Sequence, residues 1–219
     1  DNRETGIIEE IMLENFFQNP QLSYSLWDMV LFDKTARQDN LTLLLNTSCL
    51  DANTENGKII SITAWQSPCE TVHTIKARYF ADCSGDSILS TLTGAHFRYG
   101  REAESEFGES IEPKTADKKT MGMSCLFQVR ETDKPQKFTP PEWAYKYCTD
   151  DDIPFREHDL SSNFWWIETG GEGDCIHDTD KCRDELLKIA YGVWDHIKNH
   201  GDHGAENYEL EWVGILPGK

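Results

Sequence analysis

The chain has no long apolar segment and few positive charges. No apolar run approaches the roughly 20 residues that a helix needs to cross a bilayer, so we expect no membrane partner through a spanning segment. The 21 lysines and arginines are outnumbered by 39 aspartates and glutamates, which gives a net charge of -18. Nucleic acids and anionic membranes bind cationic surfaces, so this charge argues against both as partners. A single phosphate held by backbone N–H groups remains compatible with it.

The chain also lacks any Cys-x-x-Cys pair. Its seven cysteines are an odd number, so a disulfide framework is not expected and free thiols are the default. One group of ligand-type residues, Cys175, His177 and Cys182, has no fourth member, and structural zinc sites need four ligands. We therefore expect no zinc site in that group.

Three motifs that often carry catalysis or nucleotide binding are absent. The sequence contains no Gly-x-Ser-x-Gly nucleophile elbow and no Gly-x-x-x-x-Gly-Lys phosphate loop. No Gly-x-Gly-x-x-Gly follows a strand near the N-terminus, so these residues do not supply a complete dinucleotide-binding fold. The opening residues run directly into a helical pattern and the last ones carry no tail. We therefore expect both ends to be cut from a longer parent.

Hydrophobic spacing predicts an α+β fold in which helices pack on an antiparallel β-meander. Helices are expected over residues 4–18, 25–38, 86–92 and 179–200. Strands are expected over residues 41–45, 58–66, 71–81, 120–130, 163–168 and 208–213. This pattern predicts a helical hairpin in 1–40, a β-meander with a strand–turn–helix in 41–95, and an α+β substrate-binding region in 96–219, together forming one compact domain.

The most informative segment is a strand that stops at Cys83-Ser84-Gly85-Asp86 and restarts as a helix. A glycine at such a junction lets the backbone turn tightly and lets a ligand approach closely. Free N–H groups at the start of the following helix would suit a phosphate. Asp86 is placed to cap the helix or to meet a ligand hydroxyl. We take Cys83, Ser84, Gly85 and Asp86 as candidate cofactor-binding residues.

A histidine cluster lies near the end of the helix expected over residues 179–200. His196 and His200 are four residues apart, a spacing at which two imidazoles can share a metal, and His203 follows just beyond. The His-Glu-x-x-His pattern of metalloproteases is absent, and the helix dipole favours histidine near a C-terminus in any case. We therefore expect no tightly bound metal. His196 and His203 are candidates for substrate binding or proton transfer.

Two adjacent tryptophans, Trp165 and Trp166, are expected on a strand, where neighbours point to opposite faces. One can fill the core while the other, beside Glu168, faces a cleft and stacks on a sugar ring or a flavin. These three residues are candidate substrate-binding residues, although both tryptophans can equally be packing residues. A different class of protein, a non-catalytic carbohydrate-binding module, would use Trp143, Trp165 and Trp166 as stacking platforms. A metallohydrolase built on the histidine cluster is a weaker alternative.

Several segments together resemble the middle of a bacterial FAD-dependent oxidoreductase family. They are residues 4–11, 80–86, 94–103, 105–109, 120–123, 165–171, 194–199 and 216–219. The resemblance implies an enzyme that transfers a hydride from a small, sugar-like or polyol substrate to FAD, with the turn at residues 83–86 contacting the cofactor. It also implies that the glycine-rich Rossmann part of the parent chain is a missing partner. We therefore expect this chain alone to carry no FAD and to be inactive.

Overall fold

The computed structural model describes residues 3–154, 156–160 and 164–218. The chain divides into two compact units, residues 1–97 and 98–219, which are described in turn. Both combine helices with antiparallel strand pairs, so the predicted α+β class is confirmed. The finer three-part division expected from the sequence stays a prediction. In the part of the chain that is described, no helix has both the length and the apolar character to span a membrane.

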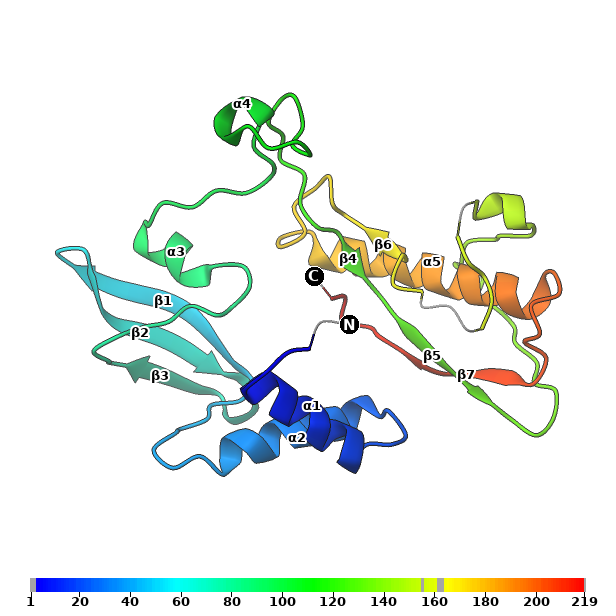
Figure 1. Cartoon of the computed structure of the whole chain (residues 1–219), viewed down its shortest axis with the longest axis horizontal. Coiled ribbons are helices and arrows are strands. Elements are labelled where there is room, and N and C mark those ends of the chain that lie inside the picture. Colours follow the sequence, from blue (N-terminus) through cyan, green and yellow to red (C-terminus); the bar gives the residue numbers. More distant parts are fainter. Residues whose placement is uncertain (1–2, 155, 161–163, 219) are drawn as a thin grey trace. The chain divides into compact units, whose positions relative to one another are not determined.

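The first unit begins with the predicted helical hairpin. Helices α1 (Ile7–Gln18) and α2 (Tyr24–Ala36) contact each other, and Lys34 on α2 forms an ion pair with Glu10 on α1 (Figure 1). Asn19 closes the connection between them. Its side chain accepts a hydrogen bond from the Ser23 N–H at 2.7 Å and donates to the Ser23 carbonyl at 2.9 Å. A buried amide is stabilised only when its groups are paired, and Asn19 is almost fully buried.

Strands β1 (Thr47–Glu55), β2 (Lys58–Gln66) and β3 (Thr71–Ile75) form the predicted antiparallel meander. The hairpin between β1 and β2 turns at Asn56 and Gly57, which have φ values of 50° and 74°. Two left-handed residues in a two-residue turn match the right-handed twist of the flanking strands. The 3-10 turn η1 (Ser67–Cys69) joins β2 to β3.

Two strand predictions in this unit were wrong, one in its existence and one in its length. The expected strand at residues 41–45 does not form, because the chain turns at Leu45 and Asn46 and pairs with β2 only from Thr47 onward. The strand expected to reach residue 81 ends at Ile75, the last residue of β3 that pairs with β2. Helix α3 (Ile88–Thr93) follows, and Gly94, with a φ of 70°, caps its C-terminal end.

The second unit is built from two separate strand pairs and one long helix. Strand β4 (Met123–Ser124) pairs with β6 (Glu168–Thr169), and β5 (Phe127–Glu131) pairs with β7 (Tyr208–Val213). The single strand predicted over residues 120–130 is therefore two strands with different partners. Helix α4 (Glu104–Phe107) lies in a stretch for which the sequence predicted neither a helix nor a strand. The long helix, α5 (Thr179–Asn199), agrees with its prediction to within one residue.

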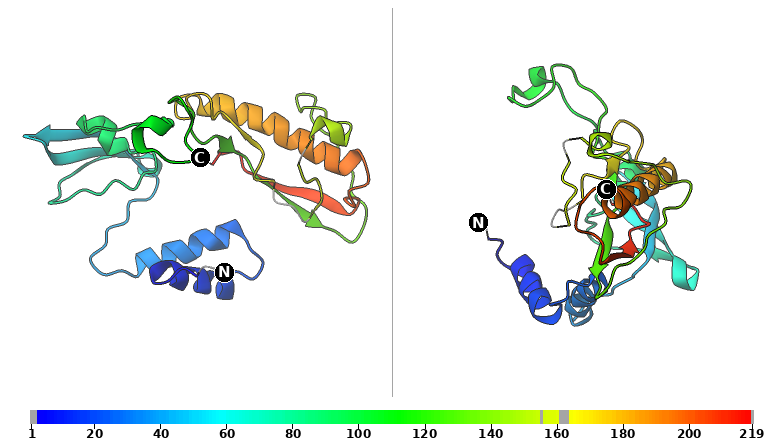
Figure 2. Two further views of the ribbon diagram at one scale, coloured as in Figure 1. Left: turned by 45° about the horizontal axis from the view of Figure 1, so that its top comes forward. Right: turned by 90° about the vertical axis from the view of Figure 1, so that its right-hand side faces the viewer.

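One face of α5 forms the core of the second unit, and the views of Figure 2 show this helix running alongside the strand pairs. The buried residues of this face are Cys182, Leu186, Ala190, Val193, Trp194 and Ile197. They pack against buried side chains of the strands and loops, including Met123, Cys125, Phe164 and Ile167. The 3.6-residue repeat places these positions on one stripe, and the same apolar repeat predicts the helix over residues 179–200.

The irregular segment between β5 and β6 is docked on the backbone of α5. The Tyr145 N–H donates to the Lys188 carbonyl at 3.2 Å, and the Tyr145 carbonyl lies so close to Gly192 that a Cβ there would sit 2.5 Å from its oxygen. Only glycine leaves room for this approach. The segment contains the short 3-10 turn η2 (Asp150–Asp152) and is otherwise irregular where it is described.

The strand predicted over residues 163–168 was wrong. Residue 163 lies outside the described residues, and residues 164–167 form a turn in which the Ile167 N–H donates to the Phe164 carbonyl at 3.0 Å. Strand β6 begins only at Glu168. The alternating-face argument for Trp165 and Trp166 therefore does not apply, because both residues lie in the turn.

All seven cysteines are free thiols, and their burial predicts their reactivity. Cys69, Cys83 and Cys148 are exposed, whereas Cys125, Cys175 and Cys182 are buried. Burial raises the pKa of the Cys125 and Cys182 thiols, and the thiolate is the reactive form. We expect a disulfide reagent to label the three exposed thiols of the native protein rapidly and the three buried ones only after denaturation. Peptide mapping would contradict this if Cys125 reacted as fast as Cys69.

Candidate functional site

The glycine turn is held by Asp82 and Ser84. The Asp82 carboxylate accepts hydrogen bonds from the Ser84 N–H at 3.0 Å, the Ser84 hydroxyl at 2.7 Å and the Leu89 N–H at 2.8 Å. The Ser84 hydroxyl in turn accepts the Ile88 N–H at 3.2 Å. The hydrogen bonds from Ser84 and Leu89 lower the pKa of Asp82, so this carboxylate is ionised. Asp82 is a turn-forming residue that the sequence reasoning missed.

This arrangement corrects the expected binding mode at the start of α3. The N–H groups of Ile88 and Leu89 are already accepted by side chains, so they are not free for a phosphate. A charged carboxylate at the same place would also repel one. What remains is Gly85, which has a φ of 83° and open space where a Cβ would lie, within the exposed segment 81–87. The turn therefore fits a ligand that approaches the Gly85 backbone closely and offers hydroxyl or amide groups.

The predicted substrate residues lie in different environments. Trp166 packs against Phe164, with ring centroids 6.2 Å apart, and under the Arg156 guanidinium at 5.7 Å. Trp165 is 62% exposed. The Glu168 carboxylate accepts the Gly122 N–H at 2.9 Å and so helps to join β4 to β6. Of the two tryptophans, Trp165 is the one placed to stack on a ligand.

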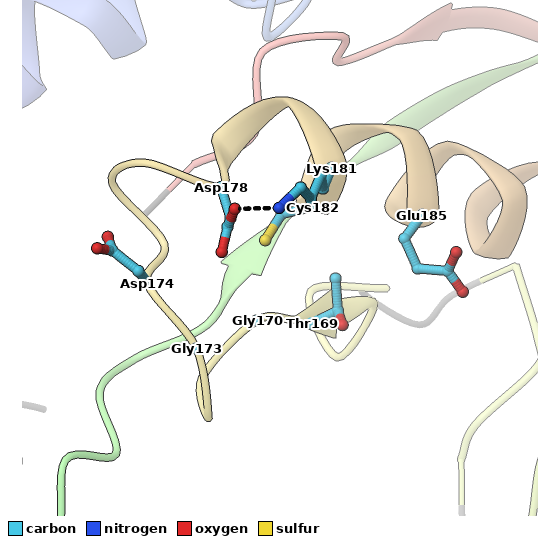
Figure 3. Close-up of a pocket in the computed structure, with 8 residues that line it drawn as sticks. All are labelled: Thr169, Gly170, Gly173, Asp174, Asp178, Lys181, Cys182 and Glu185. Carbon is cyan, nitrogen blue, oxygen red and sulfur yellow. Dashed lines mark hydrogen bonds and ion pairs between the residues drawn. The ribbon is translucent and has the colours of Figure 1, made fainter.

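A shallow hollow of about 220 Å³ lies at the start of α5, and Figure 3 shows its lining residues. They are Thr169, Gly170, Gly173, Asp174, Asp178, Lys181, Cys182 and Glu185. Its one lysine is paired with Asp178 at 2.6 Å, so the lining is acidic overall. None of the predicted site residues lines it, and an anionic ligand would be repelled there.

Three histidines and one aspartate meet at the other end of α5. Asp150 lies on η2, His158 on the loop after it, His196 in the last turns of α5, and His203 on the loop beyond. Their candidate ligand atoms all lie within 4.8 Å of one another. The ring centroid of His196 is 5.0 Å from that of His158 and 4.9 Å from that of His203.

The sequence prediction for this cluster was right in part. It placed His196 and His203 near each other but paired His196 with His200, four residues on. The structure instead places the His200 Nε2 beside the Asp195 carboxylate at 3.4 Å, and brings His158 and Asp150 to His196. Sequence reasoning missed both because they lie some 40 residues before His196, in a segment without regular structure.

The histidine rings are oriented by backbone carbonyls. The His196 Nδ1 lies 3.0 Å from the Tyr147 carbonyl, and the His158 Nε2 lies 2.9 Å from the Ile153 carbonyl. Burial lowers the pKa of His196, and the neighbouring His203 and His158 add to this effect, while the hydrogen bond to the Tyr147 carbonyl and the charge of Asp150 oppose it. His196 is therefore a neutral imidazole at neutral pH, with its second nitrogen directed into the cluster.

The cluster borders an open groove of about 540 Å³. The groove is lined by Asp150, Asp151, Ile153, Pro154, Arg156, His158, Asp159 and His203. Asp150 is 75% exposed in its side chain, whereas the His158, His196 and His203 side chains are 9%, 1% and 13% exposed. Solvent reaches the cluster from the Asp150 side.

Comparison with known proteins agrees with the resemblance seen in the sequence. No curated protein and no solved structure is significantly similar to the chain. The family model described as FAD dependent oxidoreductase matches residues 11–219, which is nearly the whole chain and includes both the glycine turn and the histidine cluster. The chain therefore belongs to the FAD-dependent oxidoreductase family.

Proposed function

We propose that this chain is the part of a flavin oxidoreductase that presents a small, sugar-like or polyol substrate to FAD. The family match over residues 11–219 is the observation that carries the proposal. FAD, when bound, supplies the hydride acceptor, and the protein supplies binding and orientation. The bacterial origin implied by the resemblance is part of the same proposal.

The cofactor contact is assigned to the turn at Cys83, Ser84, Gly85 and Asp86. Its support is the left-handed Gly85, whose missing side chain leaves open space on an exposed surface. Asp82 holds the turn in this conformation, because its carboxylate accepts hydrogen bonds from the N–H groups of both Ser84 and Leu89. A ribose-like hydroxyl suits the carboxylates around the turn better than a phosphate does, since a carboxylate accepts hydrogen bonds from hydroxyls and repels anions.

The substrate contact is assigned to Trp165 and Glu168, with Trp166 as a packing residue behind them. An exposed indole offers a flat face for a sugar-like ring, and the exposed Glu168 side chain offers acceptors for hydroxyl groups. A flat apolar face and a hydroxyl acceptor together suit the two kinds of surface of a sugar-like ring, so the pair supports a polyol or sugar-like compound.

The histidines are poorer candidates for the base that removes a hydroxyl proton. The Nε2 atoms of His196 and His203 are both buried. A general base must come within hydrogen-bonding reach of the substrate proton, and a buried nitrogen does so only after the cluster opens. Neither residue is therefore assigned a catalytic role.

The alternative of a carbohydrate-binding module gains little support. Trp143 packs edge-on against Tyr191, with centroids 5.1 Å apart, and Trp166 packs against Phe164. Two of the three tryptophans that such a module would use are therefore engaged in packing.

The flavin spectrum tests the proposal. We expect the 219-residue chain alone to purify without stoichiometric flavin and without activity, because its sequence has no glycine-rich βαβ motif to hold the nucleotide. A longer protein that contains these residues together with such a unit should be yellow and show a flavin absorbance spectrum. Stoichiometric flavin on the 219-residue chain would refute the expectation that this chain alone does not hold FAD. A correctly folded longer protein that binds no flavin would refute the function.

A further inference from the structure

We infer that Asp150, His158, His196 and His203 form a zinc site in the second unit. The inference goes beyond the proposed flavin chemistry and does not depend on it. It also departs from the sequence expectation of no tight metal, which rested on the lack of a fourth ligand for the histidines. His158 and Asp150 complete that ligand set. Among the described residues, this is the one group of three or more His, Cys, Asp or Glu side chains arranged to hold an ion.

The hydrogen bonds of two histidines set which nitrogen faces the cluster. A backbone carbonyl can only accept, so the nitrogen beside it must carry the proton. His196 therefore donates from Nδ1 to the Tyr147 carbonyl and His158 from Nε2 to the Ile153 carbonyl. Each then directs a lone pair from its other nitrogen into the cluster. This carbonyl–imidazole arrangement is the usual outer support of a metal-bound histidine.

Two of the histidine nitrogens that face the cluster have no hydrogen-bond donor among the described residues. The Nε2 atoms of His196 and His203 are buried and make no hydrogen bond to any described residue. Oδ1 of Asp150 lies 3.2 Å from the His196 Nε2 without the alignment of a hydrogen bond, and it is itself an acceptor. Buried polar atoms are normally hydrogen-bonded, so the space between these four side chains requires a positively charged or hydrogen-bond-donating occupant. One proton can bridge only two of the four atoms, whereas one cation can bind all four.

The spacing of the atoms fits a tetrahedral ion. Bonds of 2.0–2.1 Å from zinc to nitrogen or oxygen place neighbouring ligand atoms about 3.3 Å apart. Oδ1 of Asp150 lies 3.2 Å from the His196 Nε2, 3.8 Å from the His203 Nε2 and 3.8 Å from the His158 Nδ1. Contractions of about half an ångström would bring Asp150 to this spacing from His158 and His203. The histidine ligand atoms, which lie within 4.8 Å of one another, would have to approach by at most about 1.5 Å.

The ligand types favour zinc over the hard cations. Three imidazoles and one carboxylate suit Zn²⁺ and its neighbours in the first transition row, whereas Ca²⁺ and Mg²⁺ prefer all-oxygen sites. Four protein ligands and no open position are typical of a structural site. The exposed Asp150 edge of the groove gives the ion a path to the cluster, and the acidic Asp151 beside it adds to the local attraction for a cation.

The four ligands come from two segments that are far apart in the sequence. Two lie in the irregular stretch between β5 and β6, and two lie at and beyond the end of α5. An ion bound by all four would tie this stretch to the helix. Because metal binding to the folded state stabilises it, zinc should raise the melting temperature of the protein.

The test is a zinc titration of the full chain after removal of metal with a chelator. We expect one equivalent of Zn²⁺ to bind and the melting temperature to rise. Asp150→Asn and His203→Gln should each weaken binding by at least about 100-fold, since loss of an outer-shell partner alone costs 10–100-fold. Asp150 is exposed, so its variant should fold and keep the test valid even if a histidine variant does not. His177→Gln, at an exposed histidine outside the cluster, is the matched control and should bind as the parent does.

Cobalt identifies the ligands. Co²⁺ bound to the same four side chains should give the visible bands of a tetrahedral complex without a thiolate-to-metal charge-transfer band. Three results would overturn the inference: no stoichiometric zinc uptake, unchanged affinity in Asp150→Asn and His203→Gln, or a thiolate band. The last would place the ion on Cys175 and Cys182 instead.

Discussion

Replacing Trp194 with alanine should destabilise the second unit by about 3–5 kcal/mol, the usual cost of removing a buried tryptophan. Trp194 is 1% exposed and is the largest of the fully buried side chains. Its ring contacts Phe127 on β5 and Phe138 on the following loop, with centroids 5.9 Å and 6.2 Å away. The substitution would therefore leave a cavity between α5 and the strands. Chemical denaturation followed by far-UV circular dichroism measures the loss.

The matched control is Trp143→Ala. Trp143 is 52% exposed and makes an edge contact with Tyr191, which lies on α5 as Trp194 does. Its loss should cost about 1 kcal/mol, the size of one aromatic pair. If both variants unfolded at the same denaturant concentration, α5 would not be the centre of this core.

In a flavin-loaded protein that contains these residues, replacing Gly85 with valine should release FAD. The left-handed conformation costs a valine about 1–2 kcal/mol, and its side chain would fill the open space that we assign to the ligand. Each 1.4 kcal/mol of lost contact lowers affinity tenfold, so a blocked approach should reduce flavin content by at least about tenfold. Flavin absorbance per mole of protein measures it.

Gly108→Val separates strain from ligand contact. Gly108 has a φ of 72° and, like Gly85, has no atom within 4 Å of the position of a Cβ. The backbone penalty should therefore be similar, with no change in flavin content. Full flavin occupancy in Gly85→Val would show that the turn at residues 83–86 is an ordinary loop. Equal loss in both variants would mean that strain alone is responsible.

The sequence predicted best where one periodic pattern filled a whole element. Helix α5 and strands β2 and β7 were placed to within a residue, because a strict apolar repeat was bounded by turn residues. The apolar residues of 41–45 and the aromatic ones of 164–167 looked like strands but have no partner strand in the described structure. Strand formation depends on pairing with a distant segment, and local composition does not report that pairing.

The sites show the same limit. The glycine turn was found because a left-handed junction requires glycine, which is visible in the sequence, whereas the role of Asp82 depends on a hydrogen bond to a residue seven positions away. The sequence predicted two members of the histidine cluster, His196 and His203, but not His158 or Asp150. Helical spacing gave His196, but it suggested His200 as its neighbour, and no local pattern connects His196 to His158. The assignments at residues 83–86, Trp165, Trp166 and Glu168 remain predictions.

Tyr145 donates a hydrogen bond to the Lys188 carbonyl and lies against Gly192. These contacts couple the conformation of the loop between β5 and β6 to the folding of α5. A segment with little regular structure normally exchanges its amide protons by local fluctuation. Here the Tyr145 amide is bound to the helix backbone itself, so it can exchange only when the loop lifts from α5 or the helix opens at that turn. The middle of the loop should therefore share the slow exchange of the helix, and the two should behave as one cooperative unit.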